Sequence, residues 1–123
     1  MEISQFLKEC EAFFVLSMNG DFPSGRPFGA VMEYDGDLYI YIYTDNRKNV
    51  YNQLKNHSQM QIVALKQESR DWIRINGIAS ECIDFMVKKK MLMECPNLKK
   101  HYNAENDIHF ALFQIKIVDV NFY

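Results

Sequence analysis

The sequence predicts a mainly β domain of six antiparallel strands closed into a small barrel, with α-helices flanking it. Its 123 residues, 48% hydrophobic and 24% charged, suit one globular domain. Short segments of alternating apolar and polar residues are separated by turn signals, which indicates strands. These strands do not alternate with helices, so a doubly wound parallel sheet is disfavoured. Six antiparallel strands in so short a chain must hide their edges, and closure is the usual solution.

The first elements are one helix and three strands. Ile3, Phe6, Leu7 and Cys10 follow the i, i+3, i+4, i+7 spacing of an amphipathic helix. "AFFVLSM" and "SGRPFGAVMEY" predict two strands, and "LYIYIYT" shows the clearest alternation in the chain. Short turns, "NGD" and then "YDGD", separate the three, so we expect an antiparallel meander. In sequence order, these strands cover residues 12–18, 24–34 and 38–44.

The second half of the sequence predicts two helices inserted among three more strands. A helix is expected over 46–57 with Asn46 as its N-cap, and a second helix is expected from Asp84, interrupted or restarted at Pro96. The remaining strands are expected over residues 59–66, 71–82 and 109–120, the first two joined by a polar turn around Glu68 and Ser69.

Composition excludes several classes of function. The net charge of −2 gives no basic field for nucleic acid, and the run Lys88–Lys90 is expected to be a solvated helix face. No apolar run reaches bilayer length and no signal peptide opens the chain, so no membrane partner is expected. Three cysteines without close spacing form neither a zinc motif nor a disulfide framework. We therefore expect no metal site and a reducing, cytoplasmic location.

One junction between strand and helix suggests an anion site. Thr44 ends a predicted strand, and Arg47 and Lys48 follow in the first turn of the predicted helix. Cations at a helix N-terminus are unfavourable by up to roughly 1 kcal/mol each, unless an anion binds there. Two solvated basic residues in a loop are the alternative explanation.

The stretch "RPFG" at 26–29 extends this site. In the expected meander, Arg26 lies within a residue or two of position 45, beside the same cations. Three cations would repel one another unless an anion lay among them, with only Asp45 as a nearby acid. Pro27 lacks an N–H and Gly29 lacks a side chain, so a flat ring could lie along this backbone.

The motifs in order resemble the FMN-binding split β-barrel family of pyridoxamine 5'-phosphate oxidase and its nitroimidazole-reductase-like branches. The resemblance covers nearly the whole chain. It is carried by "GDFPSGRPF" at 20–28, "DGDLYIYIYT" at 35–44, "NRK" at 46–48, "WIRINGIA" at 72–79 and "PNLKKHY" at 96–102.

This resemblance implies a six-stranded antiparallel Greek-key split barrel, one FMN-binding domain over residues 1–123, and a homodimer with two FMN sites at the subunit interface. Arg26 and Lys48 would bind the FMN phosphate, with Thr44, Asn46 and Arg47 as helpers. Trp72, Arg74 and Asn76 share a strand face and could come from the partner subunit. The isoalloxazine would be bordered by the backbone of Pro27, Phe28 and Gly29 and by Tyr43.

The chain also departs from the oxidase itself. Val31 stands where the oxidase has a lysine, and an arginine-rich C-terminal motif is absent, which puts pyridoxamine phosphate oxidation in doubt. The resemblance implies an FMN-dependent oxidoreductase that passes electrons from a reduced nicotinamide to a small organic acceptor. A non-catalytic flavin sensor, a heme-binding relative and a purely structural dimer remain the alternatives. His57, His101 and His109 lie at predicted element ends, so none is assigned as a heme ligand.

Overall fold

The computed structural model describes residues 2–34, 39–102 and 107–123 of the chain. Within these ranges it contains six strands, three α-helices and a short 3₁₀ helix, so the predicted mainly β class is confirmed. In chain order the elements are α1 (Glu2–Glu9), β1 (Phe13–Asn19), β2 (Phe22–Phe28), β3 (Tyr39–Asp45), α2 (Asn49–Asn56), β4 (Gln59–Leu65), β5 (Trp72–Cys82), α3 (Phe85–Glu94), η1 (Pro96–Lys100) and β6 (Phe110–Phe122).

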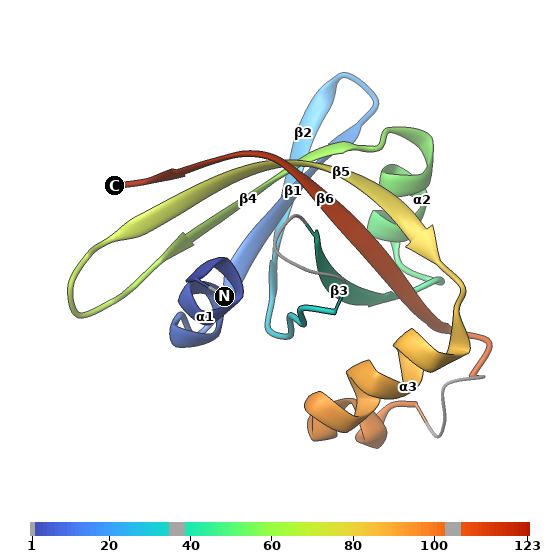
Figure 1. Cartoon of the computed structure of the whole chain (residues 1–123). Coiled ribbons are helices and arrows are strands. Elements are labelled where there is room, and N and C mark those ends of the chain that lie inside the picture. Colours follow the sequence, from blue (N-terminus) through green and yellow to red (C-terminus); the bar gives the residue numbers. More distant parts are fainter. Residues whose placement is uncertain (1, 35–38, 103–106) are drawn as a thin grey trace.

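The six strands form one antiparallel sheet in the order β2-β1-β4-β5-β6-β3. Figure 1 shows this sheet curled into a half-barrel, with α2 beside the β1–β2 hairpin and α3 at the far end from the β4–β5 turn. The edge strands are β2 and β3. The chain that follows β2 meets β3 at one bridge, where Met32 and Tyr41 exchange two backbone hydrogen bonds of 3.0 and 2.8 Å.

The expected meander is wrong in its second step. β2 ends at Phe28 rather than continuing to residue 34, and it pairs with β1, where Arg26 lies opposite Val15. β3 pairs instead with the last strand, β6. Pro23 and Pro27 remove two backbone donors from β2, which suits an edge strand better than one paired on both sides. Residues 35–37 of the expected hairpin turn, and Leu38, lie outside the described residues.

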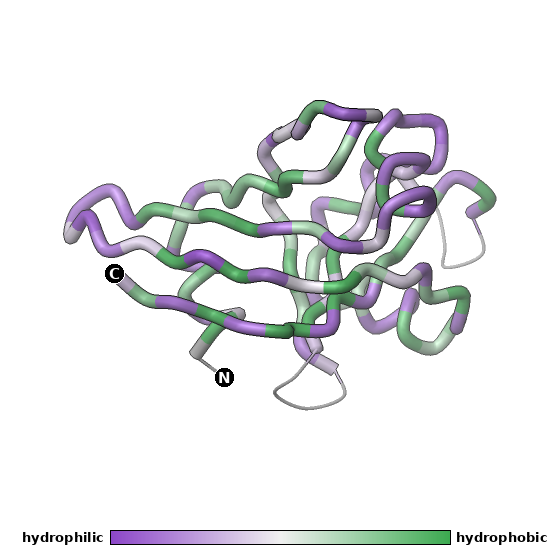
Figure 2. The backbone as a smooth tube through the Cα atoms, turned by 90° about the horizontal axis from the view of Figure 1, so that it is seen from above, coloured by the Kyte–Doolittle hydropathy of each residue, from purple (hydrophilic) through white to green (hydrophobic). Residues whose placement is uncertain are grey.

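The concave side of the sheet forms the first core. The predicted amphipathic helix is confirmed as α1, whose Ile3, Phe6 and Leu7 are buried against the sheet. The inward residues of β4 and β5, such as Ile62 and Ile75, are fully buried in the same core. The tube in Figure 2 alternates between hydrophobic and hydrophilic residues along β6, as expected for strands with two different faces.

A second core lies between the other face of the β3–β6 pair and helix α3 with η1. The start of β6 is therefore buried on both sides, from Phe110 to Phe113. The helix expected from Asp84 is confirmed as α3, and Asp84 caps it by accepting a 2.8 Å bond from the backbone N–H of Met86. Lys88 departs from the expected solvated face, because it is buried and donates to the carbonyl oxygen of Phe110 at 3.0 Å.

A bulge bends the two longest strands. The pairing of β5 with β6 shifts register between Asn76 and Gly77. A Cβ at Gly77 would lie 2.6 Å from Cγ2 of Ile115 and 3.1 Å from the carbonyl oxygen of Lys116. The sheet therefore needs glycine here in order to curl.

Candidate functional site

Most of the residues predicted for the anion site surround one pocket. It has a volume of about 120 Å³ and lies between the end of β2, the end of β3 and the start of α2. Pro27, Phe28 and Gly29 contribute from one side, and Tyr43 and Thr44 from β3. The pocket is lined by Arg26, Pro27, Phe28, Gly29, Tyr43, Thr44, Lys48 and Val50.

Arg26 is held in place by neutral acceptors. Its Nη1 donates to Oγ of Ser17 at 2.9 Å and to the carbonyl oxygen of Val15 at 3.2 Å. Its Nη2 donates to Oγ of Ser24 at 2.8 Å and to Oε1 of Gln53 at 2.7 Å. Ser17 also donates to Gln53 at 2.6 Å, so these polar side chains hold one another. The guanidinium is thus oriented before any ligand arrives.

The charge of Arg26 is not neutralised by this network. Among the described residues no carboxylate forms an ion pair with it. Burial lowers the pKa of the guanidinium from its ordinary value, yet arginine stays protonated in proteins. A partly buried cation surrounded by neutral acceptors leaves a local positive potential that an anion can satisfy.

The start of α2 adds to this potential. Lys48 is the N-cap residue, its side chain makes no capping bond, and the first turn holds no acidic residue. Within the described parts of the chain, the Lys48 amine has no hydrogen bond or ion pair. The first N–H groups of a helix have no intrahelical partner, and they carry a partial positive charge. The pocket therefore combines two side-chain cations with a helix N-terminus.

The β3 side of the pocket supplies a hydroxyl and an aromatic ring. Thr44 is buried at the end of the strand. The Tyr43 ring is half-buried, with its centroid 6.2 Å from that of Tyr102 and 6.3 Å from that of Phe110. Burial raises the pKa of the Tyr43 phenol, so this group is a neutral wall at physiological pH.

The backbone at Gly29 borders open space. A Cβ built at this glycine would meet no atom within 4 Å, and its φ lies outside the left-handed region. Neither packing nor backbone conformation within the described chain therefore requires glycine at this position. A flat ligand or a second chain that approaches the backbone here would require it.

Two predicted residues have other partners. Asn46 does not cap α2, which begins three residues later; its Nδ2 donates to the carbonyl of Ile108 at 2.6 Å, and its Oδ1 lies 3.0 Å from Nδ1 of His109. Arg47 precedes the helix and forms a fork with Asp45, with Nε–Oδ1 of 2.8 Å and Nη2–Oδ2 of 2.7 Å. Asn46 thus ties the loop to the segment just before β6, whereas Arg47 is paired with the end of β3, and neither residue lines the pocket.

Asp45 completes that fork from the strand side. Arg47 holds the pKa of the carboxyl far below its ordinary value. The Tyr102 hydroxyl also donates to Oδ2 of Asp45 at 3.1 Å. Burial and this carboxylate raise the pKa of Tyr102 well above its ordinary value. The expected group of three cations therefore reduces to Arg26 and Lys48.

Trp72 and Arg74 lie outside the Arg26 pocket. They stand at the start of β5, and the Trp72 ring stacks on the Tyr123 ring with centroids 4.2 Å apart. The Arg74 guanidinium lies 5.1 Å from the Trp72 centroid. Neither side chain lines the Arg26 pocket. Their assignment to the site of a second copy of the chain stays a prediction.

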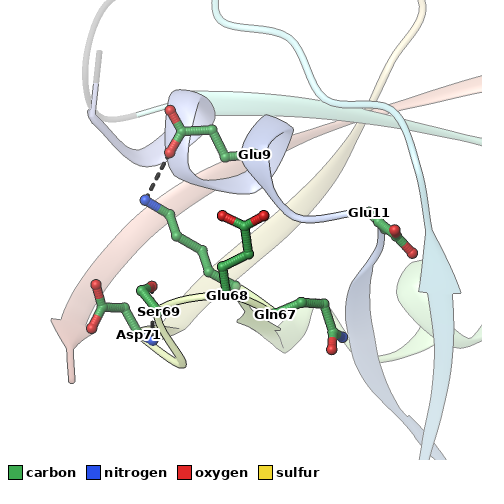
Figure 3. A pocket seen from close by; sticks show the side chains of 7 residues that line it. Glu9, Glu11, Gln67, Glu68, Ser69 and Asp71 are labelled. Carbon is green, nitrogen blue, oxygen red and sulfur yellow. Dashed lines mark hydrogen bonds and ion pairs between the residues drawn. The ribbon is translucent and has the colours of Figure 1, made fainter.

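A larger hollow of about 540 Å³ carries the wrong charge for an anion. It lies between the end of α1 and the β4–β5 turn, and Figure 3 shows its carboxylates from Glu9, Glu11, Glu68 and Asp71. Lys66 lines it as well and pairs with Glu9 at 2.7 Å. Within the described ranges no group of three or more His, Cys, Asp or Glu side chains could hold a metal ion.

Sequence reasoning missed the residues that orient Arg26. Ser17 is a polar residue at a buried alternate position of β1, and Gln53 is a buried amide one turn after Val50 in α2. Polar side chains at core-facing positions are expected to have partners, and that signal could have marked both residues. Ser24 and Val50 carried no comparable signal, because their roles depend on how β2 pairs and how α2 packs.

Comparison with known proteins now adds a family context. The pattern of the pyridoxamine 5'-phosphate oxidase family matches residues 1–123. A NimC/NimA family protein from Clostridium acetobutylicum has a similar structure, with 33% identity, a TM-score of 0.86, and coverage of 93% of this chain and 79% of that one.

Two more distant structures share the fold. A pyridoxamine 5'-phosphate oxidase-like protein from Listeria innocua has 18% identity, a TM-score of 0.77 and coverage of 98% and 94% of the two chains. A protein from Mesorhizobium loti described as FAD-binding has 17% identity, a TM-score of 0.69 and coverage of 98% and 89%. No curated protein matches the chain. No helix in the described part of the chain is long and apolar enough to span a membrane.

Proposed function

The chain belongs to the pyridoxamine 5'-phosphate oxidase family, and from this premise we propose that it binds FMN and acts as a flavin-dependent oxidoreductase. The observation that carries the proposal is the Arg26 pocket. Two cations without carboxylate partners in the described chain meet there beside a helix N-terminus. Phosphate is the common biological anion that such a set of donors binds.

The residues of the pocket fit the phosphate end of FMN. Arg26 is pre-oriented by neutral acceptors, Lys48 is unpaired within the described chain, and Thr44 offers a hydroxyl. A volume of about 120 Å³ suits a phosphate but is too small for a three-ring isoalloxazine. The ring system would therefore lie outside the pocket, along the open backbone at Gly29.

A second copy of the chain would cover that ring. Phe14, Leu65 and Ile78 point outward from β1, β4 and β5, with exposures of 49%, 39% and 39%. Exposed apolar side chains that share one sheet face are typical of a protein interface. We propose that this face forms the homodimer, and that Trp72 and Arg74 of the second copy complete the site.

Bound flavin would supply the redox chemistry, taking two electrons from a reduced nicotinamide and passing them to a small organic acceptor. The chain would bind and orient the flavin and exclude water from it. Pyridoxamine phosphate, which an oxidase would oxidise as the electron donor, is not the substrate that we propose, because Val31, at the position of the oxidase lysine, is buried in the first core. The description of the Mesorhizobium loti protein as FAD-binding supports a flavin in this fold.

The test begins with the absorption spectrum of the purified protein and a fluorescence titration with FMN. We expect yellow protein, or apoprotein that binds added FMN, and loss of binding when Arg26→Ala is combined with Lys48→Ala. The control is Lys99→Ala with Lys100→Ala, which removes the same charge from exposed residues of η1. Colourless protein that binds no FMN would overturn the proposal. Bound FMN without NADH or NADPH turnover, across nitro compounds, quinones and flavins, would indicate a non-catalytic flavin protein.

A further inference from the structure

Four uncharged acceptors surround the Arg26 guanidinium and occupy both of its terminal nitrogens. The carbonyl oxygen of Val15 and Oγ of Ser17 accept from Nη1, while Oγ of Ser24 and Oε1 of Gln53 accept from Nη2. We call these four acceptor residues the Arg26 cradle. Each terminal nitrogen carries two N–H groups and meets two acceptors. Within the described part of the chain, the cradle therefore leaves Nε–H as the arginine donor that a ligand can take.

Gln53 links the members of this cradle across three elements of the fold. Its Oε1 accepts from Arg26 at 2.7 Å and from Oγ of Ser17 at 2.6 Å, so both lone pairs of this oxygen are used. Ser17 also accepts from Arg26, which closes a ring of three side chains from α2, β1 and β2. Gln53 is 9% and Ser17 2% exposed, so a bond lost here leaves a buried polar group without a partner. The ring therefore fixes Arg26 relative to the start of α2.

The absence of charge on Gln53 matters as much as its geometry. A glutamate at this position would have nearly the same shape and could accept the same two hydrogen bonds. Its bond to Arg26 would be charge-assisted, and such bonds are roughly twice as strong as neutral ones. The carboxylate would also cancel the positive charge that attracts a phosphate. An amide therefore holds Arg26 in place and leaves its charge available to a ligand.

We propose that Gln53 is a positioning residue of the phosphate site and sets its preference for FMN over riboflavin, the flavin without a phosphate. Gln53 does not line the Arg26 pocket, so it acts through Arg26. Its amide oxygen orients the guanidinium so that Nε–H is donated to the phosphate, and its lack of charge leaves Arg26 free to pair with that anion. This inference rests on the proposed function, because it assigns a role toward the same flavin.

The experiment is a fluorescence titration of the apoprotein with FMN and with riboflavin, at low and at high salt. Gln53→Glu should raise the Kd for FMN at least about tenfold and leave the Kd for riboflavin within about twofold, because only the phosphate loses its partner. The salt dependence of FMN binding should also weaken, because one cation of the site is neutralised. The matched control is Asn52→Glu, which adds the same charge to an exposed residue of α2 and should change either Kd by less than about threefold.

A second variant separates orientation from charge. Gln53→Met has a similar size but no acceptor for Arg26, so the guanidinium keeps its charge and loses its orientation. We expect the Kd for FMN to rise about three- to tenfold, the usual effect of one lost neutral hydrogen bond, while the salt dependence and the Kd for riboflavin stay at their wild-type values. Thermal melting of each variant confirms that the fold is retained.

The outcomes separate this inference from the proposed function. Wild-type affinity for FMN in Gln53→Glu or in Gln53→Met would overturn the inference and leave the proposed function standing. An equal loss of affinity for FMN and riboflavin in either variant would also overturn it, because residue 53 would then act only through the packing of α2. Binding of neither flavin by the wild-type protein would overturn the proposed function, and the inference with it.

Discussion

Two adjacent cations, Arg47 and Lys48, are expected to differ in their contribution to flavin binding. Replacement of Lys48 by Gln removes a cation that lines the pocket and has no partner within the described chain. Arg47 has a side chain that is 65% exposed, and it is already paired with Asp45, whose side chain is 10% exposed. Only Lys48 of these two neighbours lines the pocket, so we propose the phosphate contact for Lys48 and not for Arg47.

The expected magnitude follows from the kind of bond that is lost. A hydrogen bond to a charged group contributes about 1.5–3 kcal/mol, so Lys48→Gln should raise the Kd for FMN by about 10- to 150-fold. The matched control replaces both halves of the neighbouring ion pair, Asp45→Asn with Arg47→Gln, and leaves net charge unchanged. It should alter the Kd by less than about threefold, because it removes no charge from the pocket.

The assay is a fluorescence titration with FMN at low and at high salt. The difference between the variant and the wild type should shrink as salt rises, because this lysine is exposed to screening. Equal weakening by the single variant and the double control would refute the assignment of the phosphate contact. An unchanged Kd for Lys48→Gln would refute it as well. Thermal melting of each variant confirms that the fold is retained.

Three further predictions concern glycines and acid stability. Gly29→Ala should leave the melting temperature within about 2 °C of the wild type, because the Cβ of the new alanine would meet nothing within 4 Å. The same variant should weaken FMN binding. Unchanged FMN affinity would show that no ring approaches this backbone. Gly77→Ala should lower stability by about 1–3 kcal/mol in urea unfolding, because its Cβ would lie 2.6 Å from Ile115, and an unchanged midpoint would mean that the bulge relaxes freely. Arg47→Ala should move the acid-unfolding midpoint to higher pH. The low pKa of Asp45 in the folded protein contributes stability that is complete above the ordinary pKa of 3.8 and is lost as pH falls through the folded pKa. The measurement is circular dichroism against pH. An unchanged unfolding midpoint would mean that Asp45 keeps its low pKa without Arg47.

Much of the candidate site could be predicted from the sequence because its parts are local. Arg26, Pro27 and Gly29 stand out within one short segment, and Thr44 and Lys48 stand out at one junction between strand and helix. The pocket joins these two segments although the strand pairing expected to bring them together is wrong. The curl of the sheet brings the ends of β2 and β3 together instead, and the bridge between Met32 and Tyr41 lies close to the expected register.

The sequence by itself determined which segments become strands and helices, because alternation and helical spacing are properties of neighbouring residues. It also determined that cations gather near the start of α2. Only the tertiary structure decided which cation remains unpaired. Asp45 engages Arg47, and Asn46 turns to His109, which is 63 residues away. Such choices depend on competition among partners that only folding brings into reach.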